Sequence, residues 1–191
     1  MADFNLCFGI TMKIEGGYSN LSTDRGGETY KGVSRKYHPT WEGWKILDQV
    51  KIKNDTELAK NVVLQNQVKS FYKTTFWDKL KGDLIPSQLL AEELFDTGVN
   101  MGTTPAVKFL QEALNVLNRN KALYPDTTVD GVMGASTLSY LTLLLAKDKE
   151  DLVYKVMNIL QGKYYLDIMN TDSSQEANAR GWLTRVQFTK T

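Results

Sequence analysis

Glu15 is the residue of this sequence best placed to act as a general acid. A general acid needs a carboxyl group that stays protonated near neutral pH, which requires partial burial and a fixed position beside the substrate. Glu15 ends a segment with helical periodicity, and Gly16 and Gly17 directly after it allow a substrate to approach the backbone closely. A surface carboxylate beside a helix end would show the same Glu-Gly-Gly spacing, so the spacing alone leaves both interpretations open.

The polar loop after the two glycines carries Asp24 and Thr29, which can fold back over Glu15. An aspartate in a glycine-rich loop is also a common turn residue, and a threonine in a hairpin is also a common strand residue. Both residues are therefore candidates for catalysis, with a structural role as the alternative for each.

Helical periodicity dominates the rest of the chain and predicts a mainly α fold. Asp3 can cap a first helix that runs to Glu15, and turn-forming residues from Tyr18 to Val33 predict an irregular loop with a small hairpin. Thr104 and Pro105 form a helix start signal, a capping side chain followed by proline at the first helical position. Further helices are expected at about 56–77 behind Asn54 and Asp55, and at 87–99, 135–146 and 149–170.

The composition argues against several classes of protein. The 191 residues include 23 Lys and Arg and 22 Asp and Glu, a net charge of +1 that gives no electrostatic reason to expect nucleic acid binding. The single cysteine, Cys7, cannot form an intramolecular disulfide, and with a single histidine a structural zinc site is not expected. We therefore expect no metal.

The sequence shows neither a secretory signal nor a membrane span. The first residues lack a basic start with a long apolar run, and the longest apolar stretch, Leu141 to Ala146, is too short to cross a bilayer. We expect synthesis in the cytoplasm without a signal peptide and no stable insertion into a membrane.

Two strings follow each other at the end of the first expected helix: Glu15-Gly16-Gly17-Tyr18-Ser19-Asn20 and Asp24-Arg25-Gly26-Gly27-Glu28-Thr29-Tyr30-Lys31-Gly32-Val33. Together they resemble the signature of glycoside hydrolase family 108, lysozyme-like N-acetylmuramidases whose Glu-Gly-Gly-Tyr element carries the catalytic acid. Later blocks resemble the family in the same order: Phe71-Tyr72-Lys73, Trp77-Asp78, Phe95-Asp96, Val99-Asn100-Met101-Gly102, Leu110-Gln111 and Gly181 to Val186.

The resemblance implies a lysozyme-like fold of two helical lobes, with a small β-hairpin beside the catalytic helix. Residues 1–100 would form the catalytic region, and residues 101–191 a helical, peptidoglycan-binding-like part packed with it as one globular unit. The implied reaction is hydrolysis of the β-1,4 bond between N-acetylmuramic acid and N-acetylglucosamine in peptidoglycan glycan strands. Glu15 would be the acid, Asn100 would contact substrate, and no cofactor would be needed.

A more distant resemblance to phage lysozymes implies that Asp24 and Thr29 organise the attacking water. A carboxylate facing the acid with a hydroxyl beside it is an arrangement that positions water, so we predict inversion at the anomeric carbon. Tyr18 and Tyr30 would wall a saccharide cleft, because aromatic rings with a polar tip can stack on sugar C–H surfaces.

The loop from Thr127 to Gly134, with Thr137, resembles the Asp-Gly, Gly and Thr pattern of small peptidoglycan-binding modules. A purely structural connection is the alternative for this loop. Some members of the family are described as putative secretion activators and others as phage or prophage endolysins. The protein would act on the cell wall in the periplasm or outside the cell, and its export would need a holin or a secretion channel. A noncatalytic peptidoglycan-binding or secretion-accessory protein is the alternative function.

Overall fold

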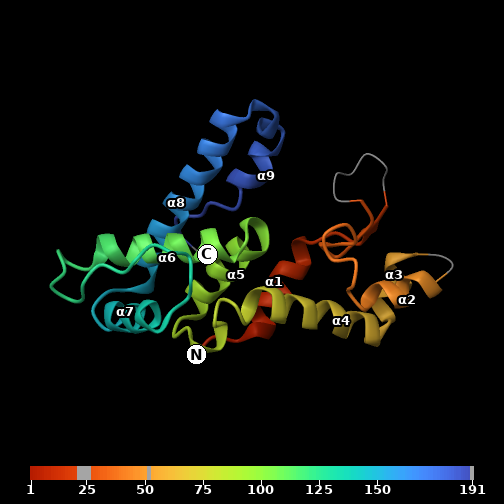
Figure 1. Ribbon diagram of the computed structural model, residues 1–191, viewed down its shortest axis with the longest axis horizontal. Coiled ribbons are helices and arrows are strands. Elements are labelled where there is room, and N and C mark those ends of the chain that lie inside the picture. Colours follow the sequence, from red (N-terminus) through yellow and green to blue (C-terminus); the bar gives the residue numbers. More distant parts are fainter. Residues whose placement is uncertain (21–26, 51–52, 190–191) are drawn as a thin grey trace. The chain divides into compact units, whose positions relative to one another are not determined.

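The computed structural model describes residues 1–20, 27–50 and 53–189, and in these ranges it is mainly helical with one small sheet (Figure 1). The contacts divide the chain into two compact units. The N-terminal unit comprises residues 4–78, and the C-terminal unit comprises residues 1–3 and 79–191. The predicted mainly α fold with a small β element is confirmed. Asp24 lies outside the described residues.

The helices of the N-terminal unit pack around a core that is rich in aromatic residues. Tyr72 and Trp77 are almost completely buried, and Phe8 packs edge-on against Tyr72 with the ring centroids 5.7 Å apart. Burial of such rings is a large apolar contribution to folding. The helices are α1 (Phe4–Ile14), α2 (Gly43–Gln49), α3 (Asp55–Lys60), α4 (Val62–Tyr72) and a π-helical segment η1 (Lys73–Trp77).

The single helix expected over residues 56–77 is wrong, because the chain breaks it at Asn61. Asn61 has an extended backbone, and its side chain accepts a hydrogen bond from the Leu64 amide at 3.0 Å. It thereby caps α4, since an asparagine oxygen satisfies an amide that has no partner in the first turn. Asn54 caps α3 in the same way, as expected, through the Thr56 amide.

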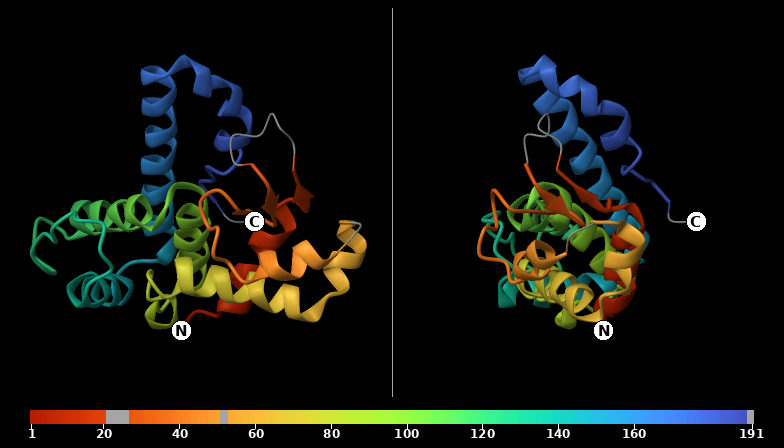
Figure 2. Two further views of the ribbon diagram at one scale, coloured as in Figure 1. Left: turned by 45° about the vertical axis from the view of Figure 1, so that its right-hand side comes forward. Right: turned by 90° about the vertical axis from the view of Figure 1, so that its right-hand side faces the viewer.

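A three-stranded antiparallel sheet follows α1 and lies beyond its C-terminal end (Figure 2). Tyr18 pairs with Tyr30, and Tyr30 pairs with Val33. The connection between the second and third strands is a two-residue turn in which Lys31 and Gly32 have φ of 43° and 76°. Two positive φ angles are typical of the tight turns that match the twist of a hairpin. The strands are β1 (Tyr18–Ser19), β2 (Thr29–Tyr30) and β3 (Val33–Ser34).

The C-terminal unit is built on α5 (Gln88–Met101) and α6 (Thr103–Leu117), which pack against each other and against α8 (Glu150–Thr171). The helix start predicted at Thr104 and Pro105 is displaced, because Gly102 with φ 92° ends α5 and α6 begins directly at Thr103. The predicted helices at 135–146 and 149–170 are confirmed. The other elements of the unit are η2 (Gly82–Leu84), α7 (Ala135–Leu145), η3 (Ser173–Asn178) and α9 (Ala179–Leu183). Among the described helices, none is both long and apolar enough to cross a membrane.

Candidate active site

Glu15 stands immediately beyond the end of α1, where the helical hydrogen bonding still holds its backbone. The Glu15 amide donates to the Thr11 carbonyl at 3.1 Å. A hydrogen bond between residues four apart in sequence is the pattern of an α-helix. The residue as a whole is half-buried. Its carboxyl group is therefore carried on a fixed backbone and is partly withdrawn from solvent, as a general acid requires.

The Glu15 carboxyl lies against the tight turn of the sheet. A Cβ atom placed on Gly32 would come within 2.6 Å of Glu15 Oε2, and it would also clash with the Tyr72 hydroxyl. Only a glycine at this position lets the turn approach both groups so closely. The turn, the end of α1 and the end of α4 therefore meet at the Glu15 carboxyl.

Tyr72 supplies a buried hydroxyl beside this carboxyl. The side chain is 2% exposed, and its hydroxyl donates to the Lys31 carbonyl at 2.9 Å. Burial raises the pKa of Tyr72, and the negative charge of Glu15 raises it further. Tyr72 therefore remains a protonated donor throughout the physiological range, and its hydrogen bond anchors the turn that borders Glu15.

The two glycines after Glu15 have different surroundings. Gly16 faces open space, whereas a side chain on Gly17 would collide with the Asp55 carboxylate. Asp55 Oδ1 accepts a hydrogen bond from the Tyr18 amide at 2.7 Å. The group that approaches Gly17 closely is thus the Asp55 carboxylate of the same chain. Contact of Gly16 and Gly17 with substrate stays a prediction.

Tyr18 is tied to Glu28 at the base of the β1–β2 connection. The Tyr18 hydroxyl donates to Glu28 Oε1 at 2.7 Å, and Lys53 Nζ donates to the same oxygen at 2.7 Å. The Lys53 ammonium also lies 4.6 Å from the centre of the Tyr18 ring. Arg35 Nε pairs with Glu28 Oε2 at 2.8 Å. Glu28 is therefore a structural carboxylate, and the hydroxyl of Tyr18 is already engaged within the protein.

Electrostatics keep Glu28 ionised in this network. Burial raises the pKa of Glu28, but hydrogen bonds from Lys53 and Tyr18 and the positive charges of Arg35 and Lys53 outweigh it, and the net shift is downward. Glu28 thus connects Tyr18, Arg35 and Lys53 as a carboxylate.

Thr29 and Tyr30 are neighbours on β2 and point to opposite faces of the sheet, because side chains alternate along a strand. Tyr30 is 1% exposed, and its hydroxyl accepts from Gln65 Nε2 at 2.9 Å. Tyr30 therefore packs in the core of the N-terminal unit and not along a cleft, which corrects the expected wall position. Thr29 is half-buried. Its neighbour Tyr30 is tightly packed, so β2 fixes the position of the Thr29 side chain.

Asn100 belongs to the C-terminal unit. It is exposed near the end of α5, and its side-chain amide donates to the Asp96 carbonyl at 2.7 Å. Contact of Asn100 with substrate stays a prediction. Within the described ranges, no group of three or more His, Cys, Asp and Glu side chains is arranged to hold a metal ion.

Sequence reasoning missed three residues that shape the surroundings of Glu15: Gly32, Tyr72 and Asp55. A signal existed for each of them. Lys31-Gly32 between two strand-forming residues fits a two-residue turn, Tyr72 lies on the apolar stripe of α4, and Asp55 follows a capping asparagine. None of these signals indicates which distant carboxyl or amide the residue meets.

Comparisons of the sequence with known families give two matches. Residues 8–102 match the family described as Glycosyl hydrolase 108, and residues 105–187 match the family described as a predicted peptidoglycan domain. No curated protein matches the sequence significantly.

The fold is also similar to a solved structure, that of Brucella abortus SagA. The two chains share 21% sequence identity with a TM-score of 0.62, over 96% of this chain and 88% of the other. At this level of identity the similarity establishes a shared fold.

We predict that Gly32→Ala destabilises the N-terminal unit. The substitution forces a Cβ into a left-handed backbone, which costs about 1–2 kcal/mol before any clash with Glu15 and Tyr72 is counted. Denaturant unfolding followed by circular dichroism measures the free energy of unfolding. Gly9→Ala, in α1 with open space around it, is the control and is expected to gain roughly 0.5–1 kcal/mol. Equal stability of wild type and Gly32→Ala would contradict the packing described here.

A second prediction concerns Glu28 and pH. Because the pKa of Glu28 is lowered by folding, its ionised form stabilises the fold above its unfolded pKa of about 4.3, and this stabilisation disappears as pH falls through the lower folded value. Glu28→Gln should therefore lower the melting temperature at neutral pH, and the difference from wild type should shrink in acid. Glu57→Gln, which breaks an exposed pair with Lys60, should have little effect at either pH. A Glu28→Gln deficit that does not change with pH would rule out this electrostatic role.

Proposed function

Since the chain belongs to the glycosyl hydrolase 108 family and carries a predicted peptidoglycan domain, we propose that it hydrolyses the β-1,4 bond between N-acetylmuramic acid and N-acetylglucosamine. The observation that carries this proposal is the position of Glu15. Glu15 is half-buried at a helix end, and its carboxyl lies against the Gly32 turn and beside the buried Tyr72 hydroxyl. Peptidoglycan glycan strands are the proposed substrate.

In the proposed reaction Glu15 protonates the glycosidic oxygen as the bond breaks. The sugar develops oxocarbenium character, water attacks the anomeric carbon, and the two sugar units separate. The neighbouring Tyr72 keeps its proton and holds the turn that borders Glu15. Glu15 is therefore the proton donor in the site, and Tyr72 is a positioning residue.

The water side of the reaction is assigned to Asp24 and Thr29. The Thr29 hydroxyl can accept and donate a hydrogen bond, so it can hold a water molecule, and the Asp24 carboxylate can take the proton of that water. An inverting glycosidase uses such a water on the face of the sugar opposite the acid. Inversion is part of the proposal.

The biological setting we propose follows from the substrate. Peptidoglycan lies outside the cytoplasm, so the protein would act in the periplasm or outside the cell as an endolysin or a secretion-associated muramidase. A holin or a secretion channel is the proposed route across the membrane.

We predict that Glu15→Gln abolishes clearing of purified peptidoglycan and leaves the fold intact. The amide has the shape of the carboxylic acid but cannot donate the proton, and general-acid assistance contributes about 100- to 10,000-fold. Turbidity of a sacculus suspension measures the rate, and circular dichroism checks the fold. Glu57→Gln, the same change on the exposed surface of α3, should clear at the wild-type rate.

Two results would contradict this assignment. Clearing by Glu15→Gln at the wild-type rate would remove Glu15 from the reaction. Sedimentation of the wild-type protein with sacculi without clearing would identify a noncatalytic binder.

The stereochemical course can be tested separately. We predict that the first product formed from the β-linked substrate is the α-anomer, as inversion requires, which NMR of the fresh reaction mixture detects. Thr29→Val and Asp24→Asn should slow the reaction less than Glu15→Gln does, and Thr29→Ser, which keeps the hydroxyl, should slow it less than Thr29→Val. An initial β-anomer would show retention and remove the water-positioning role of this pair.

A further inference from the structure

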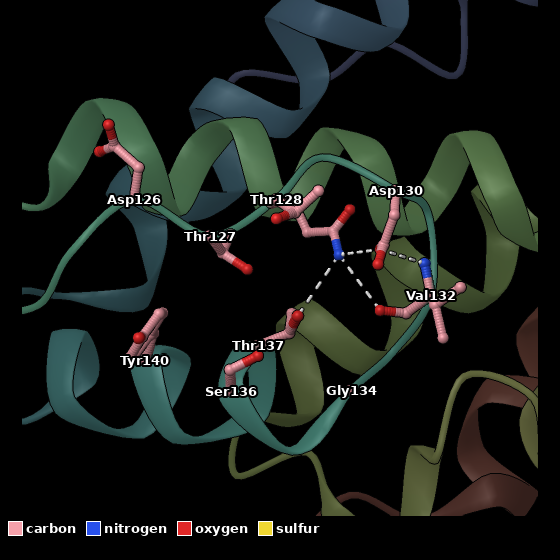
Figure 3. Close-up of a pocket in the computed structure, with 10 residues that line it drawn as sticks. Asp126, Thr127, Thr128, Asp130, Val132, Gly134, Ser136, Thr137 and Tyr140 are labelled. Atoms are coloured by element: carbon pink, nitrogen blue, oxygen red, sulfur yellow. Dashed lines mark hydrogen bonds between the residues drawn. The ribbon is translucent and has the colours of Figure 1, made fainter.

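The C-terminal unit carries a polar pocket of about 260 Å³ between the loop that precedes α7 and α7 itself (Figure 3). Thr127 and Thr128 line it from the loop, and Ser136 and Tyr140 line it from the first turns of the helix. Gln111 of α6 forms part of the lining as well. The pocket is smaller than the roughly 300–1,000 Å³ of sites that enclose whole drug-sized ligands, so it suits a small unit of a larger molecule.

The pocket is held in shape by Gln111, which is 1% exposed. Gln111 Oε1 accepts from the Gly131 amide at 2.9 Å, and Nε2 donates to Asp130 Oδ1 at 2.8 Å and to the Val132 carbonyl at 3.1 Å. Gly131 has φ 78°, and a Cβ there would lie 2.9 Å from the Thr104 carbonyl oxygen. The loop is therefore fixed on α6 before any ligand arrives, which lowers the entropy cost of binding.

The wall of the pocket presents hydroxyl groups. Thr127 is anchored through its backbone, whose amide and carbonyl both bond to the Asn115 side chain, at 2.8 and 2.9 Å. The Tyr140 ring stacks on Tyr124 at 4.6 Å, so its orientation is fixed. Rigidly mounted hydroxyls that can both donate and accept are suited to a ligand with hydroxyl and amide groups of its own.

The charges near the pocket disfavour an anionic ligand. Hydrogen bonds from Lys121 and Asn118 lower the pKa of Asp126, and a hydrogen bond from Gln111 with one from the Val132 amide lowers the pKa of Asp130. Both residues line the pocket as carboxylates at neutral pH, and the lining residues include no Lys or Arg that could pair with the carboxylates of a peptide stem.

A cationic ligand is also less suited to the pocket than a neutral one. Lys121 Nζ lies 2.8 Å from Asp126 Oδ2, so this carboxylate already has a cation. Asp130 Oδ1 accepts from Gln111 and from the Val132 amide, and the positive charge of Lys108 also lowers the pKa of Asp130. The arrangement therefore favours a neutral, hydroxyl-rich ligand over an ammonium group.

We infer that this pocket binds one N-acetylhexosamine unit of a glycan strand and so holds the polymer at a point carried by the C-terminal unit. The inference rests on the proposed function, because that function supplies the glycan. It adds a named subsite, formed by Thr127, Thr128, Ser136 and Tyr140, for the neutral sugar backbone of the strand.

The test is a titration of the full Glu15→Gln chain with chitotetraose, an N-acetylglucosamine oligomer without peptide stems, followed residue by residue with amide NMR. We expect shifts at Thr127, Thr128 and Ser136. Ser136→Ala and Tyr140→Phe each remove one hydroxyl and should weaken binding about 2- to 10-fold. Ser139→Ala, an exposed serine of α7 outside the pocket lining, is the matched control and should bind as before.

Each other outcome overturns the inference. Shifts confined to other parts of the chain would place the sugar elsewhere, and an equal loss in Ser139→Ala would show a nonspecific effect. Pocket shifts caused by a free stem peptide and not by chitotetraose would identify a peptide site.

Clearing of peptidoglycan tests the proposed function separately from the subsite. If the wild-type protein clears peptidoglycan but chitotetraose causes no amide shifts in the pocket, only the subsite is overturned. Chitotetraose in the pocket of a chain that never clears peptidoglycan supports the subsite and overturns the proposed hydrolysis.

Discussion

The N-terminal unit depends on the close approach of the Lys31–Gly32 turn to the end of α1. A side chain at residue 32 would displace Glu15 Oε2 or the Tyr72 hydroxyl, so the sheet can take its place only with glycine there. The positive φ angles of Lys31 and Gly32 close the hairpin, and the Tyr72 hydroxyl holds the Lys31 carbonyl. One tight turn thus fixes the hairpin and borders the candidate acid on one side.

Both units use a glutamine side chain of a helix to hold a segment outside that helix. In the N-terminal unit, Gln65 of α4 donates to the Tyr30 hydroxyl and the Leu58 carbonyl, and accepts from Lys31 Nζ at 2.7 Å. In the C-terminal unit, Gln111 of α6 bonds the loop around Asp130. An amide side chain offers donors and an acceptor together, so it can bond several groups of a neighbouring segment at once. In both units, a helix that contributes to the core thus holds a neighbouring segment through one amide side chain.

Sequence patterns predicted the elements of this fold better than their contacts. Periodic apolar residues located α5, α7 and α8, because helices with one buried face leave that signature. Apolar residues continue at helical spacing on both sides of Asn61. Periodicity alone therefore does not show that this asparagine ends one helix and caps the next. The polar neighbours of Tyr30 in the sequence favour a cleft position, but β2 directs its side chain into the core, where its hydroxyl accepts a hydrogen bond from Gln65. Long-range contacts such as that of Glu15 with the Gly32 turn leave no local sequence pattern. The string of residues around Glu15 is nevertheless sufficient to indicate the family.

The sugars at the newly formed chain ends identify the bond that is cleaved. Sacculi digested with the wild-type protein are reduced with borohydride, and the reduced sugars at the new ends are identified by mass spectrometry. Cleavage at the proposed bond between N-acetylmuramic acid and N-acetylglucosamine leaves N-acetylmuramic acid at the reducing end, so we expect its reduced alcohol. Reduced N-acetylglucosamine at the new ends would contradict the proposed cleavage.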